Sequence, residues 1–102
     1  MSRFVTLLNA VTVTGAGASV NIAGKGNVRT YQGVLVGTGT YTASVDLLAS
    51  IDGVNFVKLT TLALSNTTPT VGYTSTDAWA YVQANVTAIT GTGTAVTVTQ
   101  AT

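Results

Sequence analysis

Residues 41–51 read YTASVDLLASI, and the alternation of apolar and polar side chains in this stretch decides the fold class. Its odd-numbered positions carry Tyr, Ala, Val, Leu, Ala and Ile, while Thr, Ser and Asp fill most even positions and only Leu48 breaks the pattern. Residues 80–89 and 95–99 alternate in the same way. A period of two with one polar face is typical of β-strands that bury one side. Two sheets of such strands, packed face to face, form a β-sandwich.

The composition also favours an all-β protein. Of 102 residues, 21 are Thr and 15 are Val, and these β-branched side chains fit a pleated sheet better than a helix. No stretch repeats its apolar residues with the helical period. We therefore predict one antiparallel β-sandwich domain over residues 1–102 with about eight strands. The strand candidates lie near 4–8, 9–14, 18–23, 28–36, 40–49, 55–64, 79–89 and 94–100, the first two of which can be one bent strand.

A Gly-x-Gly motif occurs between β-like segments at residues 15–17, 37–39 and 91–93. Glycine reaches positive φ without a Cβ clash, so paired glycines suit tight turns. We predict a hairpin turn at each motif. A phosphate-binding loop is excluded because no lysine, Ser/Thr pair and helix start follow in the required order.

Two further connections are expected. Residues 50–56 contain Asp52-Gly53, a strong turn sequence, and Asn55 can bond to its own backbone. A calcium site there would need about six to eight oxygen ligands, and only Asp52 and Asn55 offer side-chain oxygens. Residues 64–75 contain Pro69 and read as a long polar crossover. Such crossovers occur in jelly rolls, so we expect a jelly-roll-like sandwich.

Charge is scarce, which excludes several function classes. Charged residues make up 7% of the chain, the net charge is +1, and His and Cys are absent. Zinc fingers, disulfide frameworks and histidine catalysis are excluded, and a basic surface for nucleic acid is missing. No apolar run reaches the roughly 18–20 residues of a membrane span, and the N-terminus lacks a signal peptide, so we expect synthesis in a cytoplasm.

Catalysis is not expected either. Asp46, Asp52 and Asp77 are the only side-chain carboxylates, and their spacing suggests no catalytic pair. Only Lys25 and Lys58 could activate a hydroxyl nucleophile. We predict a protein that is not an enzyme and binds no metal or cofactor.

The best candidates for a partner-binding surface are aromatic and polar strand residues. Trp79 shares the more polar face of its strand with Tyr81 and Gln83, and such a face suits a protein interface, although an aromatic anchor of the core is the alternative. Arg29 and Lys25 form a basic pair, expected in a solvated turn or in a salt bridge to a neighbouring subunit. The candidates are Trp79, Tyr81, Gln83, Tyr31, Tyr41 and Arg29.

The low charge predicts assembly. Free-standing β-proteins protect their sheet edges with charges or proline and keep charged, mutually repelling surfaces. This chain has seven charged side chains and one proline. We therefore expect a homo-oligomer that is stabilised by contact with other protein.

Several segments resemble small virion structural proteins of tailed bacteriophages. The segments are 37–40, 43–45, 49–59, 77–86 and 90–94. The resemblance implies a β-sandwich, often jelly-roll-like, that decorates or cements a capsid, commonly as a homotrimer. The implied partner is the major capsid protein, and the implied location is the capsid surface of the virion. Gln83 stands where the family pattern often has a basic residue, and no catalytic residue is implied.

Two other functions stay open. A tail or neck component of the virion is one. A carbohydrate-binding module that uses Trp79 and the loop 52–56 is the other. Neither alternative requires nucleic acid or a membrane.

Overall fold

Every regular element is a β-strand in the computed structural model, which describes residues 4–17, 19–22, 29–76 and 79–101. All strand pairs are antiparallel, so the predicted all-β antiparallel class is confirmed. The strands are β1 (Phe4–Val11), β2 (Gly15–Ala16), β3 (Val20–Asn21), β4 (Arg29–Ser50), β5 (Val57–Ser65), β6 (Thr70–Ser75) and β7 (Tyr81–Ala101).

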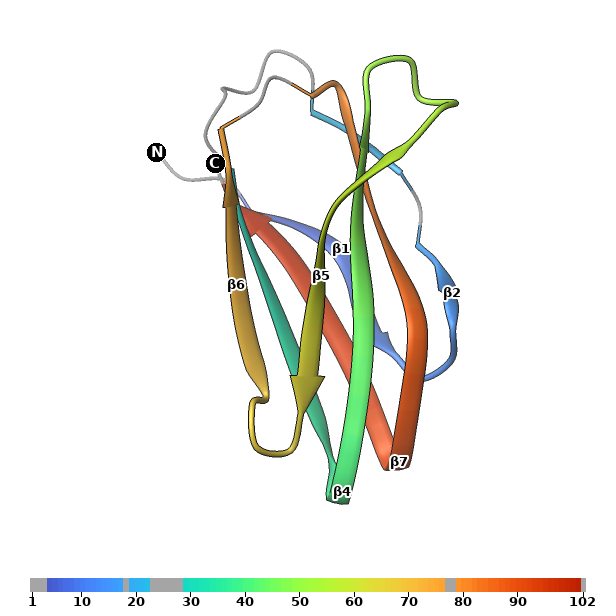
Figure 1. The fold of residues 1–102 in the computed structure, drawn as a ribbon, viewed down its shortest axis with the longest axis vertical. Helices are drawn as coiled ribbons and strands as arrows, with labels where there is room; N and C mark the ends of the chain where they lie inside the picture. The colour runs from blue at the N-terminus through green and yellow to red at the C-terminus, as the bar shows by residue number, and fades with distance from the viewer. Residues whose placement is uncertain (1–3, 18, 23–28, 77–78, 102) are drawn as a thin grey trace.

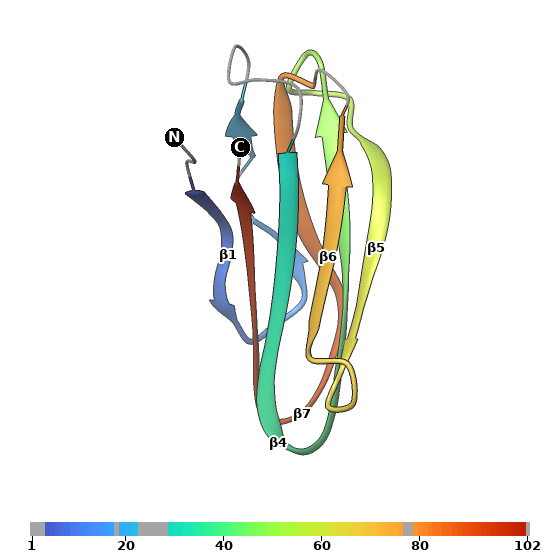
Figure 2. The same cartoon turned by 90° about the vertical axis from the view of Figure 1, so that its left-hand side faces the viewer.

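The strands belong to one hydrogen-bonded sheet in the order β1-β7-β4-β5, with β2 and β3 added to β7 and β6 added to β4. The long strands β4 and β7 pair from Thr30↔Ala101 to Ser50↔Tyr81. Both bend midway, so that their halves lie in two layers (Figures 1 and 2). One layer contains β1, β6, the first half of β4 and the second half of β7. The other contains β2, β3, β5 and the remaining halves.

Two of the Gly-x-Gly motifs lie where β4 and β7 fold back on themselves, as Figure 1 shows, so a turn is present at each. The hairpin prediction is nevertheless wrong, because the two halves of each strand lie in different layers and are not paired with each other. Residues 37–39 and 91–93 lie inside β4 and β7, where the ladder shifts register. Gly91 has φ +109°, and a Cβ there would lie 2.5 Å from the Cβ of Tyr41. Glycine permits the turn here because it adopts positive φ without strain and has no Cβ to collide with Tyr41. Four strand candidates therefore merge into two strands. The third motif is no hairpin either, because β1 and β2 each pair with β7 and not with each other.

The predicted crossover at 64–75 is also wrong in part. Ser65 and Thr68 close a tight turn by reciprocal backbone bonds of 3.0 and 3.1 Å, and β6 follows at once. Val71 and Tyr73 alternate with exposed residues and pack against the core. The polar composition and Pro69 obscured a short strand whose inward positions are Val71, Tyr73 and the buried Ser75.

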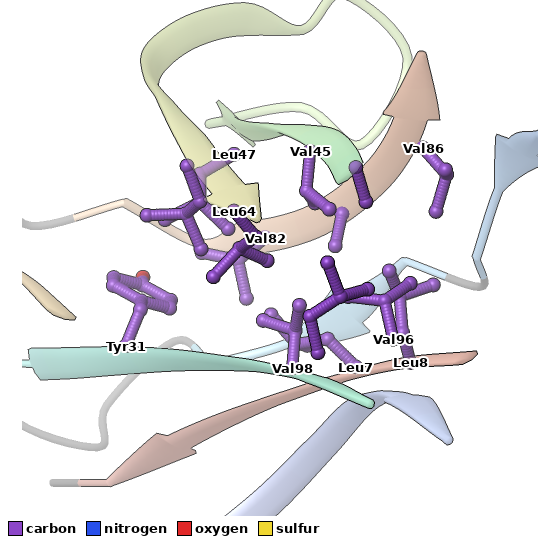
Figure 3. Packing of buried hydrophobic residues seen from close by; sticks show 14 of the residues in the cluster. Leu7, Leu8, Tyr31, Val45, Leu47, Leu64, Val82, Val86, Val96 and Val98 are labelled. Carbon is purple, nitrogen blue, oxygen red and sulfur yellow. The ribbon is translucent and has the colours of Figure 1, made fainter. Parts of the chain in front are cut away.

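The core fills the space between the two layers. Figure 3 shows side chains such as Val96 and Val98 from one layer meeting Val45 and Val82 from the other. The predicted inward positions 43, 45, 47 and 49 are each at most 2% exposed. Ile51 is instead 73% exposed, because β4 ends one residue before it.

Candidate partner-binding surface

The six predicted partner-binding residues do not form one patch. Arg29 and Tyr31 begin β4 in one layer, and Tyr41 lies beside the bend of the same strand. Tyr81 and Gln83 lie at the start of β7 in the other layer, and Trp79 lies two residues before that strand. These three locations have different environments.

Arg29 and Tyr31 are buried, at 2% and 1% exposure. The Arg29 guanidinium donates a hydrogen bond from Nη2 to the Ile22 carbonyl at 3.1 Å. The Tyr31 ring stacks on Tyr73 with centroids 6.3 Å apart. Burial raises the pKa of the Tyr31 hydroxyl above its usual value, against the opposing effect of the Arg29 charge. The solvated turn predicted for Arg29 is therefore wrong, and its predicted companion Lys25 lies outside the described residues.

Tyr41 is half-buried and supports the bend. A Cβ at Gly37 would lie 2.7 Å from Cγ of the Tyr41 ring, so the ring lies directly against that glycine. The Tyr41 N–H donates to Asn66 Oδ1 at 3.3 Å, and its carbonyl accepts from the Asn66 N–H at 2.9 Å. These contacts attach the turn after β5 to the bend.

The third location, at the start of β7, carries the aromatic side chains Trp79 and Tyr81. Tyr81 and Gln83 alternate with the buried Val82 and Ala84, as predicted, and are half-buried. Gln83 donates from Nε2 to the Gly17 carbonyl at 2.8 Å. Trp79 packs against the core, and its Nε1 is buried with no hydrogen-bond partner in the described part of the chain. Gln83 and Trp79 on this face are therefore engaged in contacts within the chain.

The predicted turn at Asp52-Gly53 is confirmed, and Asp52 organises it. Asp52 Oδ1 accepts hydrogen bonds from the N–H groups of Val54 and Asn55, and the Ser50 hydroxyl donates to it at 2.8 Å. Asn55 Nδ2 donates to Asp52 Oδ2 at 2.9 Å. These donors, the Asn55 and Val54 N–H groups above all, hold the pKa of the Asp52 carboxyl well below its usual value. Both oxygens of the Asp52 carboxylate therefore accept hydrogen bonds from within the loop.

This loop presents apolar side chains to solvent. Ile51, Val54 and Val57 are 73%, 79% and 50% exposed. Gly53, at φ +78°, lies against Tyr81, since a Cβ there would be 3.1 Å from the ring. The loop and the start of β7 therefore form one end of the molecule.

The outer face of the β6-containing layer carries no charged side chain from the described residues. Its outward positions on β4 and β6 include Thr30, Gln32, Thr70 and Thr74, and Val36 is 56% exposed. Among the described residues the charged side chains are Arg29, which is buried, and Asp46, Asp52 and Lys58, which belong to the other layer or its loop. This surface was not predicted, because β6 was not among the predicted strands. The alternation of Val71 and Tyr73 was the available signal.

The described residues contain no group of three potential metal-ligating His, Cys, Asp or Glu side chains. Asp46 accepts a hydrogen bond from Thr61 at 2.7 Å. In the same part of the chain there is no helix of the length and hydropathy that a membrane crossing requires.

Comparison with known proteins identifies a structural relative but no family. No family model matches the chain, and no curated protein sequence matches it. The fold is similar to the crystal structure of the SPBc2 prophage-derived protein YomS, with a TM-score of 0.67 and 15% sequence identity. The alignment covers 99% of this chain and 91% of that one. At this identity the likeness establishes the fold alone.

Proposed function

We propose that this chain is a structural protein of a tailed-bacteriophage virion, which decorates or cements the capsid surface as a homo-oligomer bound to the major capsid protein. The observation that carries the proposal is the outer face of β6, β4 and β7, on which the described part of the chain places no charged side chain. Burying charges against another protein costs desolvation free energy, whereas a flat surface of hydroxyl, amide and small apolar groups loses much less. The likeness to a prophage-derived protein supports a phage origin.

The proposal includes the finer fold assignment. The two layers with a core between them support a β-sandwich, and its resemblance to a jelly roll stays a prediction. The trimer suggested by the resemblance also stays a prediction.

The proposal also includes the absence of catalysis. Asp52 is fully engaged in its loop, and Asp46 is engaged by Thr61. The packing of Trp79 against the core favours the structural function over carbohydrate binding. Neither nucleic acid nor a membrane is a proposed partner.

Co-sedimentation with phage heads tests the proposal. Heads of a tailed phage that encodes this chain, prepared without it, should bind the purified protein saturably. Val36→Lys places a charge on the uncharged face and should weaken binding at least about tenfold through the cost of burying the charge. Ala63→Lys, at an exposed position of the other layer, is the matched control and should bind like the wild type. Absence of binding to heads, together with binding to a glycan array, would contradict the proposal.

A further inference from the structure

The sheet has open edges at β1, at β2 with β3, at β5 and at β6 among the described strands. Each of these edges except β6 has a feature that discourages pairing with another chain. In β1 the ladder shifts register twice, and Ala10 has φ 50°. β2 and β3 have two residues each. β5 has Lys58 and a register shift beside it.

β6 lacks these features. Its six residues carry no charge and pair with β4 without a register shift. The Leu35 N–H donates to the Pro69 carbonyl at 2.8 Å, so by antiparallel alternation Val71, Tyr73 and Ser75 turn their backbone groups toward β4. The N–H and C=O groups of Thr70, Gly72 and Thr74 therefore point to the open edge. Pro69 does not block that edge, because its missing N–H is on the β4 side.

Gly72, in the middle of this edge, is not required by the described part of the chain. Every other described glycine has a positive φ or would place a Cβ within 3.0 Å of a neighbour. Among the described residues, a Cβ at Gly72 would meet only the Tyr31 carbonyl oxygen, at 3.6 Å, and φ is not positive. Glycine weakens a strand interior, and without a side chain it leaves the backbone in the middle of this edge accessible.

We infer that β6 is a self-pairing edge, at which two copies of this chain join antiparallel about a two-fold axis that passes beside Gly72. The outward residues read Thr-Gly-Thr in either direction, so Thr70 meets Thr74 of the second copy and Gly72 meets its own equivalent. Each of these residues donates one backbone hydrogen bond and accepts one. Without charged side chains, the edge meets its copy with no like-charge repulsion, and the threonines pair across the strands.

The inference rests on the self-association that the proposed function requires, and it identifies the surface. Pairing at β6 joins the uncharged faces of two copies into one continuous face. A two-fold contact of this kind gives a dimer, and a trimer would need a different, head-to-tail contact. The interface of one short edge strand is small, so the free dimer has a dissociation constant roughly in the micromolar range or weaker. Attachment to a lattice would raise the local concentration.

Cysteine cross-linking tests the register, because the natural chain has no cysteine. The proposed pairing places the two Gly72 Cα atoms about 5.5 Å apart, which a disulfide can span. Gly72→Cys should form a covalent dimer under mild oxidation. Thr74→Cys, an exposed position on the same edge, is the matched control, since its equivalents would be separated by about 13 Å. Equal cross-linking of both variants, or none with Gly72→Cys, would overturn the pairing.

Proline substitution tests the hydrogen bonds. Gly72→Pro removes an N–H that faces the open edge and leaves the β4 ladder intact. It should raise the dissociation constant of the dimer about 30-fold in sedimentation equilibrium, through loss of one bond from each copy. Gly72→Ala retains the N–H and should stay within about threefold of the wild type. If Gly72→Pro does not fold, Gly72→Lys places two like charges at the axis and should also abolish the dimer.

Three results separate this inference from the proposed function. A wild-type chain that remains monomeric at roughly 1 mM overturns self-pairing. A Gly72→Pro protein that dimerises like the wild type overturns the β6 edge but leaves self-association standing. Dimerisation that Gly72→Pro removes, in a protein that never binds phage heads, supports the edge and contradicts the capsid function.

Discussion

Replacing Gly91 by alanine should cost a large part of the stability of this protein. Gly91 has φ +109°, and the new Cβ would lie 2.5 Å from Tyr41 Cβ and 2.6 Å from Thr94 Oγ1. The backbone strain costs about 1–3 kcal/mol. The clash costs about 1–3 kcal/mol more, because Tyr41 and Thr94 must move. The free energy of unfolding should therefore fall by roughly 2–6 kcal/mol, out of the roughly 5–15 kcal/mol typical of a domain.

Urea denaturation followed by Trp79 fluorescence measures this loss. The unfolding midpoint of Gly91→Ala should fall by about 1 M or more. Gly72→Ala is the matched control, because a Cβ there meets only one atom at ordinary contact distance. Measured at low protein concentration, it should raise the free energy of unfolding by about 0.4–1 kcal/mol. A Gly91→Ala protein as stable as Gly72→Ala would refute the argument that the bend of β4 and β7 depends on this glycine.

The remaining predictions concern the core and two titrating groups. Leu47 is 1% exposed, so Leu47→Ala should lower the free energy of unfolding, measured by urea denaturation, by about 2–5 kcal/mol. Leu48 is half-buried and points outward, so Leu48→Ala should lower it by clearly less. Equal losses in the two variants would contradict the alternation of inward and outward residues in β4. Ionised Asp52 stabilises the fold above its usual pKa of 3.8, and this stabilisation is lost as the pH falls toward the lowered folded value. Thermal melts should therefore show a steeper fall of Tm below about pH 4 for the wild type than for Asp52→Asn. Tyr31 has a raised pKa, so stability should fall as the pH rises above its usual value of 10.0, and Tyr31→Phe should lose less in alkaline melts.

The alternation of residues and one turn sequence made much of the fold predictable. Residues 43–49 and 82–86 show the period of two that the structure buries, and Asp52-Gly53 specifies the turn between β4 and β5. These features depend on local geometry, which a sequence reports directly.

The errors arose where local chemistry allows two outcomes. A glycine with positive φ serves a hairpin or a bend inside a strand, and only the pairing of β4 with β7 decides between them. β6 was missed because Thr, Ser and Pro dominate its segment, although Val71 and Tyr73 alternate. Arg29 is buried and donates a hydrogen bond to the Ile22 carbonyl, a contact that the alternation of residues does not predict.

A cryo-electron microscopy map of the virion from a phage that encodes this chain tests the central claim most directly. The account predicts density for this fold, with its principal dimensions of 41 × 29 × 18 Å, on the outer surface of the capsid, with the uncharged face of β6, β4 and β7 against other protein. The claim would be contradicted if the complete map contained no such density and the purified particles contained none of this protein.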